Sequence, residues 1–105
     1  MGLSAVRVDL FDDEFGEITL NPGETRQVGF SHPGFDDGHW VVCSARPIKT
    51  SVGNQFLDFT GIEIIRQWQN IEGNGQQNVQ VVFHNVNTGE PATFRPRFLV
   101  APSLG

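Results

Sequence analysis

Cysteine and positive charge are both scarce in this chain of 105 residues. Cys43 is the only cysteine, so no intrachain disulfide can form, which fits a reducing compartment. The net charge is −5 and Lys49 is the only lysine, so the sequence offers no basic surface to nucleic acid or to an anionic membrane. We therefore expect neither nucleic acid nor a membrane as a partner.

Long apolar stretches and catalytic motifs are also missing. No run of residues is long enough to span a bilayer, and the N-terminus lacks the apolar segment of a signal peptide, so a cytoplasmic protein is the default expectation. There is no G-x-S-x-G, phosphate-binding loop, dinucleotide fingerprint or C-x-x-C. The sequence thus predicts no catalytic residues and no cofactor, and we expect a protein that is not an enzyme.

The last quarter of the chain, 78–102, has the clearest pattern. Apolar and polar residues alternate on both sides of the turn 87–91, as in two half-buried antiparallel strands. Arg95 and Arg97 fall on the polar face, and Pro96 predicts an edge or a local break in its strand. The residues expected to face the core are Val79, Val81, Phe83, Phe94, Phe98 and Val100.

Shorter alternating segments precede this hairpin. The segment 39–46 is apolar on both faces, which predicts a central strand, and 62–68 fits period two through Ile62, Ile64 and Trp68, although a helix was the alternative. The expected strands before the hairpin are 5–11, 18–20, 25–32, 39–46, 55–59 and 62–68. The sequence therefore predicts a single all-β domain over 1–105, an antiparallel β-sandwich of about seven to eight strands, immunoglobulin-like or jelly-roll-like.

Two segments resemble the strand–turn–strand units of immunoglobulin-like bacterial modules. The first is Leu-Asn-Pro-Gly-Glu-Thr at 20–25, where Pro22 and Gly23 suit the central positions of a type II turn. The second runs over 81–94 and contains an Asn, a Gly and a Pro-Ala pair at similar spacing. The resemblance implies a β-sandwich and no particular activity. The paired core cysteines of antibody domains are absent, because Cys43 has no second cysteine to bond.

The segment 31–43, Ser-His-Pro-Gly-Phe-Asp-Asp-Gly-His-Trp-Val-Val-Cys, gathers the most reactive side chains. Imidazole and carboxylate groups from His32, Asp36 and His39 could bind a transition metal, which would make a small metal-dependent enzyme. The alternative, which we prefer, is an exposed loop in which Asp36 and Asp37 form turns and no metal binds. His39 and Cys43 lie too far apart along a strand to form a nucleophile pair, so Cys43 is expected to be a buried structural residue.

Aromatic and amide side chains suggest a binding surface. Trp40 and Trp68 are expected mainly in the core, but an exposed indole could stack on a sugar ring or anchor a protein partner. Asn70 and Asn74 belong to an amide-rich stretch, 67–78, that suits sugar hydroxyl groups. The predicted ligand-binding residues are Trp68, Asn70, Asn74, Asp36, Asp37 and His39. Arg95 and Arg97 are the predicted interface residues, which could receive carboxylates from a neighbouring subunit.

The sequence favours a non-catalytic module that binds or assembles. Its partner would be a glycan, as for a lectin, or a protein, and we expect a homo-oligomer. A structural subunit of a larger particle, such as a virion or a secreted machine, is a second form of the same hypothesis. The metal-dependent enzyme is the alternative from another class.

Overall fold

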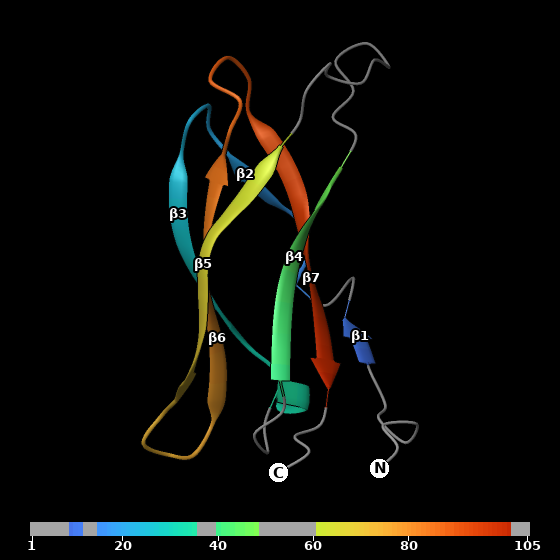
Figure 1. Ribbon diagram of the computed structural model, residues 1–105, viewed down its shortest axis with the longest axis vertical. Helices are drawn as coiled ribbons and strands as arrows, with labels where there is room; N and C mark the ends of the chain where they lie inside the picture. The colour runs from blue at the N-terminus through green and yellow to red at the C-terminus, as the bar shows by residue number, and fades with distance from the viewer. Residues whose placement is uncertain (1–8, 12–14, 36–39, 49–60, 102–105) are drawn as a thin grey trace, which may run out of the picture.

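The structure is a computed structural model that describes residues 9–11, 15–35, 40–48 and 61–101. These ranges contain strands and one short 3₁₀ helix, η1, at Pro33–Phe35 (Figure 1). The strands are β1 (Asp9–Phe11), β2 (Ile18–Leu20), β3 (Thr25–Ser31), β4 (Trp40–Pro47), β5 (Ile62–Ile71), β6 (Gln77–Asn85) and β7 (Ala92–Ala101). The predicted all-β chain is confirmed, whereas the expected strand at 55–59 lies outside the described residues.

The strands form two antiparallel sheets that face each other, as in a sandwich. Sheet A contains β7, which pairs with β1 and β2 along one edge and with β4 along the other. Sheet B has the order β3-β6-β5. Figure 1 shows sheet B on the left and β4, β7 and β1 of sheet A on the right. The two strands expected at 78–102 are present, but the expectation that they form a hairpin is wrong, because β6 belongs to one sheet and β7 to the other.

The core lies between the sheets and follows the two-residue alternation of β6 and β7. All six residues of these strands that were predicted to face inward are buried. Phe98 packs at the centre, with its ring centroid 4.9 Å from that of Phe30 and 5.2 Å from that of Phe35. Burying each such side chain contributes roughly 1.5–3 kcal/mol. These aromatic side chains therefore hold the two sheets together.

The turn between β2 and β3 has the geometry that its sequence predicts. Gly23 has φ = 69°, and the Glu24 N–H donates to the Asn21 carbonyl oxygen (3.0 Å), as in a type II turn. The Asn21 N–H in turn donates to Glu24 Oε1 (2.9 Å), and this bond lowers the pKa of the Glu24 carboxyl group. An L-residue at 23 would be strained, so this position requires glycine.

Asn85 is fully buried and connects the two turns at this end of the molecule. Its Nδ2 donates to the carbonyl oxygens of Asn21 (3.1 Å) and Glu90 (3.0 Å), and its Oδ1 accepts from the Asn87 N–H (2.9 Å). A buried amide keeps its stability only when such groups are satisfied. The asparagine of the 81–94 segment is thus a structural residue that holds the two turns together.

Pro96 lies in the middle strand of sheet A, opposite Ala45 of β4. The Ile48 N–H donates to the Thr93 carbonyl oxygen (3.0 Å), so alternate residues of β7 bond to β4 and Pro96 is not one of them. Its missing N–H therefore faces the other edge of β7, between the residues paired with β1 (98–100) and those paired with β2 (92–94). Within the described residues, no strand pairs with Pro96 on that edge, while β7 itself continues through it.

A β-bulge at Ile65 changes which face of β5 points inward. Ile64 pairs with Phe83, but Arg66 pairs with the next residue of β6, Val82, so Ile65 has no partner of its own. Beyond the bulge, Trp68 lies on the outer face of sheet B. The expectation that Ile62, Ile64 and Trp68 share one face is therefore wrong for Trp68, because the extra residue inverts the alternation.

The same bulge turns two glutamines of β5 toward β4. Gln67 Oε1 accepts from the Cys43 N–H (2.9 Å) and its Nε2 donates to the Cys43 carbonyl oxygen (3.4 Å). Gln69 Oε1 accepts from the Val41 N–H (3.4 Å). We call Gln67 and Gln69 the glutamine clasp. The glutamine clasp joins sheet B to the edge of sheet A that β4 forms. The prediction that β4 is a central strand is therefore wrong, because among the described strands β4 pairs only with β7.

Candidate functional site

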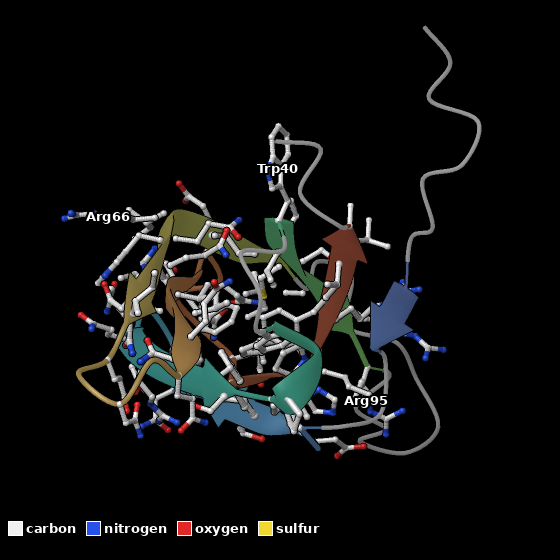
Figure 2. The ribbon with its side chains drawn as sticks, turned by 90° about the horizontal axis from the view of Figure 1, so that it is seen from below. Trp40, Arg66 and Arg95 are labelled. Atoms are coloured by element: carbon white, nitrogen blue, oxygen red, sulfur yellow. The ribbon has the colours of Figure 1, made fainter. Side chains whose placement is uncertain are left out.

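The outer face of sheet A carries exposed apolar side chains where β4 begins and β7 ends. Trp40 is 67% exposed, Val42 54% and Leu99 48%, and Val42 pairs directly with Leu99. Trp40 extends away from the rest of the molecule in Figure 2. We call these three residues the Trp40 patch. The expectation that Trp40 belongs to the core is wrong, because its neighbours Val41 and Cys43 occupy the inward positions of β4.

Arginines continue the same face beyond the Trp40 patch. Arg46 and Arg95 pair across β4 and β7, and Arg97 lies opposite Ser44. Arg95 binds Glu17 with 3.2 Å between Nη2 and Oε1, and both side chains are partly exposed. Trp40 lies opposite Ala101, so Arg95 is roughly 20 Å from the indole along the strand. The predicted interface pair, Arg95 and Arg97, therefore shares a face with the largest exposed aromatic residue.

The outer face of sheet B has a different character, because its side chains bond to one another. Gln27 Nε2 donates to Gln80 Oε1 (3.2 Å), Gln80 Nε2 to Asn78 Oδ1 (3.2 Å), and Asn78 Nδ2 to Glu72 Oε1 (3.0 Å). Gln80 lies over Gly29, where a Cβ atom would be 2.7 Å from its Nε2. This chain of side chains runs from β3 across β6 to the loop between β5 and β6, so much of its hydrogen-bonding capacity is already used.

Trp68, the first predicted sugar-stacking residue, lies on this face of sheet B. It is half-buried and pairs with Gln80 on β6. The guanidinium carbon of Arg66 lies 4.7 Å from the indole centroid, a cation–π arrangement. Figure 2 shows Arg66 and Arg95 projecting on opposite sides of the molecule. A sugar that stacked on the same face of the indole would have to displace Arg66.

The two predicted asparagines lie near the end of the β5–β6 hairpin, and both are exposed. Asn70 pairs with Asn78 on the outer face of sheet B, two residues from Trp68. Asn74 lies in the connecting loop, where its Oδ1 accepts from the Gln76 N–H (3.0 Å). The structure therefore brings Asn70 close to Trp68 but uses the carbonyl oxygen of Asn74 to form the turn.

The reactive segment 31–43 is described only in part. Asp36, Asp37 and His39 lie outside the described residues, so the structure does not place them. His32 is described: its Nδ1 accepts from the Gly34 N–H (2.9 Å), and its ring lies 5.6 Å from that of Phe35. Within the described ranges, no three His, Cys, Asp or Glu side chains are grouped so that they could hold a metal ion.

Cys43 is buried on the inner face of β4, as predicted. Burial raises the pKa of its thiol to about 12, against the opposing effect of a hydrogen bond from the Arg97 backbone. The thiolate, which is the reactive form, is therefore disfavoured at neutral pH, which agrees with a structural role for Cys43.

Sequence reasoning missed the Trp40 patch, although one signal was present. The segment 39–46 is apolar at alternate positions on both faces, which we interpreted as burial on both sides. An exposed apolar face gives the same pattern, and only the tertiary structure separates the two.

None of the helices in the described part of the chain is long and apolar enough to cross a membrane.

Comparison of the chain with protein-family models, with curated proteins and with solved structures finds no match. The site is therefore interpreted from its own geometry.

Proposed function

We propose that this chain is a non-catalytic assembly module that binds a neighbouring protein subunit through the outer face of sheet A. The observation that supports it is the Trp40 patch, in which a tryptophan is 67% exposed beside two exposed aliphatic residues. Tryptophan is the residue type most enriched among the energetically dominant residues of protein interfaces. An apolar cluster rimmed by arginines is the usual composition of such a surface.

The charge of this face indicates the kind of partner. The whole chain carries −5, yet Arg46, Arg95 and Arg97 lie together on sheet A. The rest of the chain is rich in acidic residues, so a different face of another copy could complement these arginines. Docking one face on a different face of the next copy is a heterologous contact, which closes into a ring when the rotation permits. A homo-oligomer of this kind is the form we propose.

Sedimentation velocity on the parent protein and on Trp40→Ala tests this function. We expect an oligomer that loses mass in Trp40→Ala and that weakens when salt is raised to about 0.5 M, because screening reduces the arginine contacts. Ile71→Ala is the matched control, since Ile71 is 74% exposed and lies outside the patch. A parent that stays monomeric at all concentrations, or an oligomer that Trp40→Ala leaves intact, contradicts the proposal.

Carbohydrate binding at Trp68 is the second candidate, and the neighbouring amides of Asn70 and Gln80 support it. Such a lectin would use Trp68 as its stacking surface once Arg66 had moved aside. A glycan array tests it: binding is expected to disappear in Trp68→Ala and to remain in Trp40→Ala. An array on which the parent protein binds no sugar removes this candidate.

The finer details of the fold belong to the same proposal. The two antiparallel sheets support an immunoglobulin-like or jelly-roll-like sandwich of seven to eight strands. A role as a structural subunit of a larger particle agrees with an assembly face.

The metal-dependent enzyme would use His32, Asp36 and His39. Elemental analysis of untagged protein tests it, and absence of stoichiometric metal removes it.

A further inference from the structure

The outer edge of β3 in sheet B carries no partner strand among the described residues. β3 pairs with β6 on one side, and within the described ranges no strand pairs with its other side. The Asn85 N–H donates to the Glu24 carbonyl oxygen (2.9 Å), so residue 24 and every second residue after it bond to β6. The residues that direct their backbone groups outward are Thr25, Gln27, Gly29 and Ser31, and all four are exposed. We call these four residues the β3 edge.

The β3 edge has one feature that keeps sheet edges from pairing, the charged Arg26 on its inward-facing side, and lacks the others. Its register with β6 is continuous from Thr25 to Ser31, so no bulge twists it away. The strand contains no proline and no lysine. Its one charged residue, Arg26, is held by Glu24, with 2.7 Å between Nε and Oε2. The β4 edge, by contrast, is covered by the glutamine clasp.

We infer that the β3 edge pairs antiparallel with the β3 edge of a second copy, which joins two copies of sheet B into one continuous sheet. The spacing of the outward groups is symmetric about Val28, so a two-fold axis at Val28 places Thr25 opposite Ser31 and Gln27 opposite Gly29. Every outward backbone group of the four residues then has a partner. An unrelated extended peptide would satisfy the same groups without this two-fold match.

Side chains on the β3 edge fit the same register. The longest of them, Gln27, lies opposite Gly29 of the other copy, where it meets the Gln80 amide that lies over this glycine rather than a side chain of residue 29. Arg26 lies opposite Phe30, so the pairing brings no like charges together. Pairing along one short strand covers less surface than a standard interface. We therefore expect a weak dimer that forms only at high protein concentration, separately from the assembly through the Trp40 patch.

Sedimentation equilibrium on Gln27→Pro and Gln27→Ala tests the inference. Proline at 27 removes an N–H that points away from β6, so it disrupts the dimer and spares the ladder inside the subunit. Alanine keeps that N–H and is the matched control. We expect the dissociation constant to rise at least about tenfold in Gln27→Pro, and to change much less in Gln27→Ala. Trp40→Ala is expected to leave this dimer unchanged, which separates it from the proposed function.

Two further measurements keep the test decisive if Gln27→Pro fails to fold. The double variant Thr25→Lys, Ser31→Lys places lysines opposite each other across the axis, so its dimer is expected to weaken and to recover with salt. Amide exchange is expected to slow with protein concentration at Gln27 and Gly29 but not at Val28, whose N–H already bonds to β6. A chain that is monomeric at millimolar concentration, or amides at the β3 edge that exchange independently of concentration, overturns the inference.

Discussion

The outer faces of the two sheets differ in how their side chains are satisfied. On sheet B, Gln27, Gln80 and Asn78 bond to one another, and Arg66 covers the indole of Trp68. On sheet A, the indole of Trp40 and the side chain of Val42 are exposed to solvent. Water satisfies polar groups at little cost but solvates apolar surface poorly. Whether an aromatic side chain is available to a partner therefore depends on the groups around it. Trp68 is covered by Arg66, whereas Trp40 is exposed.

Deleting Ile65 should have the largest effect, because it removes the bulge that assigns the faces of β5. Trp68 would turn inward and the glutamine clasp would turn outward, leaving the N–H groups of Val41 and Cys43 without their partners. Each lost partner at a buried group costs about 1–3 kcal/mol, so we expect the free energy of unfolding to fall by at least about 3 kcal/mol. Urea denaturation measures this. A deletion variant as stable as the parent would show that the bulge does not set the faces.

Alkaline pH should destabilise the protein because the thiol of Cys43 is buried between the two sheets. The folded-state pKa of Cys43 is raised to about 12, while the thiol of the unfolded chain titrates near 9. Between these values the unfolded state binds fewer protons, so stability is full below pH 9 and falls as pH rises toward 12, by about 1.4 kcal/mol per unit. Urea denaturation from pH 8 to 11 checks the slope. Cys43→Ala, the control, should show a shallower slope, and an equal slope in both proteins would refute the cause.

Replacing each tryptophan with alanine tests the difference between the outer faces of the two sheets. Trp68 is half-buried and stacked with Arg66, so Trp68→Ala should lower the free energy of unfolding by about 1–2 kcal/mol. Trp40→Ala, measured as a monomer, should change it by less than about 0.5 kcal/mol, because the side chain is mostly in solvent. Thermal and chemical unfolding give both values. A larger loss at Trp40 than at Trp68 would reverse our assignment of the two faces.

The smallest expected effect concerns the ion pair on sheet A. Glu17→Gln removes the carboxylate that faces Arg95, and a partly exposed pair contributes about 0.5 kcal/mol or less to stability. Assembly should strengthen in this variant, because Arg95 loses a competing carboxylate within its own chain. Sedimentation velocity measures the change in assembly, and urea denaturation measures the change in stability. Unchanged assembly would indicate that Arg95 contributes nothing to the interface, and weaker assembly would indicate that Glu17 itself contributes to it.

The sequence predicts the parts of this molecule that depend on local chemistry. Alternation identifies the buried residues of β6 and β7, and the Pro22–Gly23 turn forms as its residue types require. The exposed state of Trp40 could not be predicted, because an apolar residue on one face of a strand is buried only if another layer covers that face. The bulge at Ile65 could not be predicted either, because the composition of the strand does not reveal one extra residue. That residue nevertheless reverses which side chains of β5 face inward beyond it.

For the candidate site, the sequence identified components without their environment. It identified Trp68 and Asn70, which the structure places on one face, and Arg95 and Arg97, which it places on the other sheet. It did not foresee that Arg66 would cover the indole of Trp68, because that contact depends on the register that follows the bulge. Asp36, Asp37 and His39 stay predictions.

The glutamine clasp has a consequence for how far edge pairing can extend. Side-chain amides of Gln67 and Gln69 occupy the border of β4 that an incoming chain would need. The two-fold contact proposed at β3 would use the β3 border of both copies, so neither copy could add a further strand there. Pairing through β3 alone would therefore stop at two molecules, whereas head-to-tail pairing of two different edges would extend into a fibre.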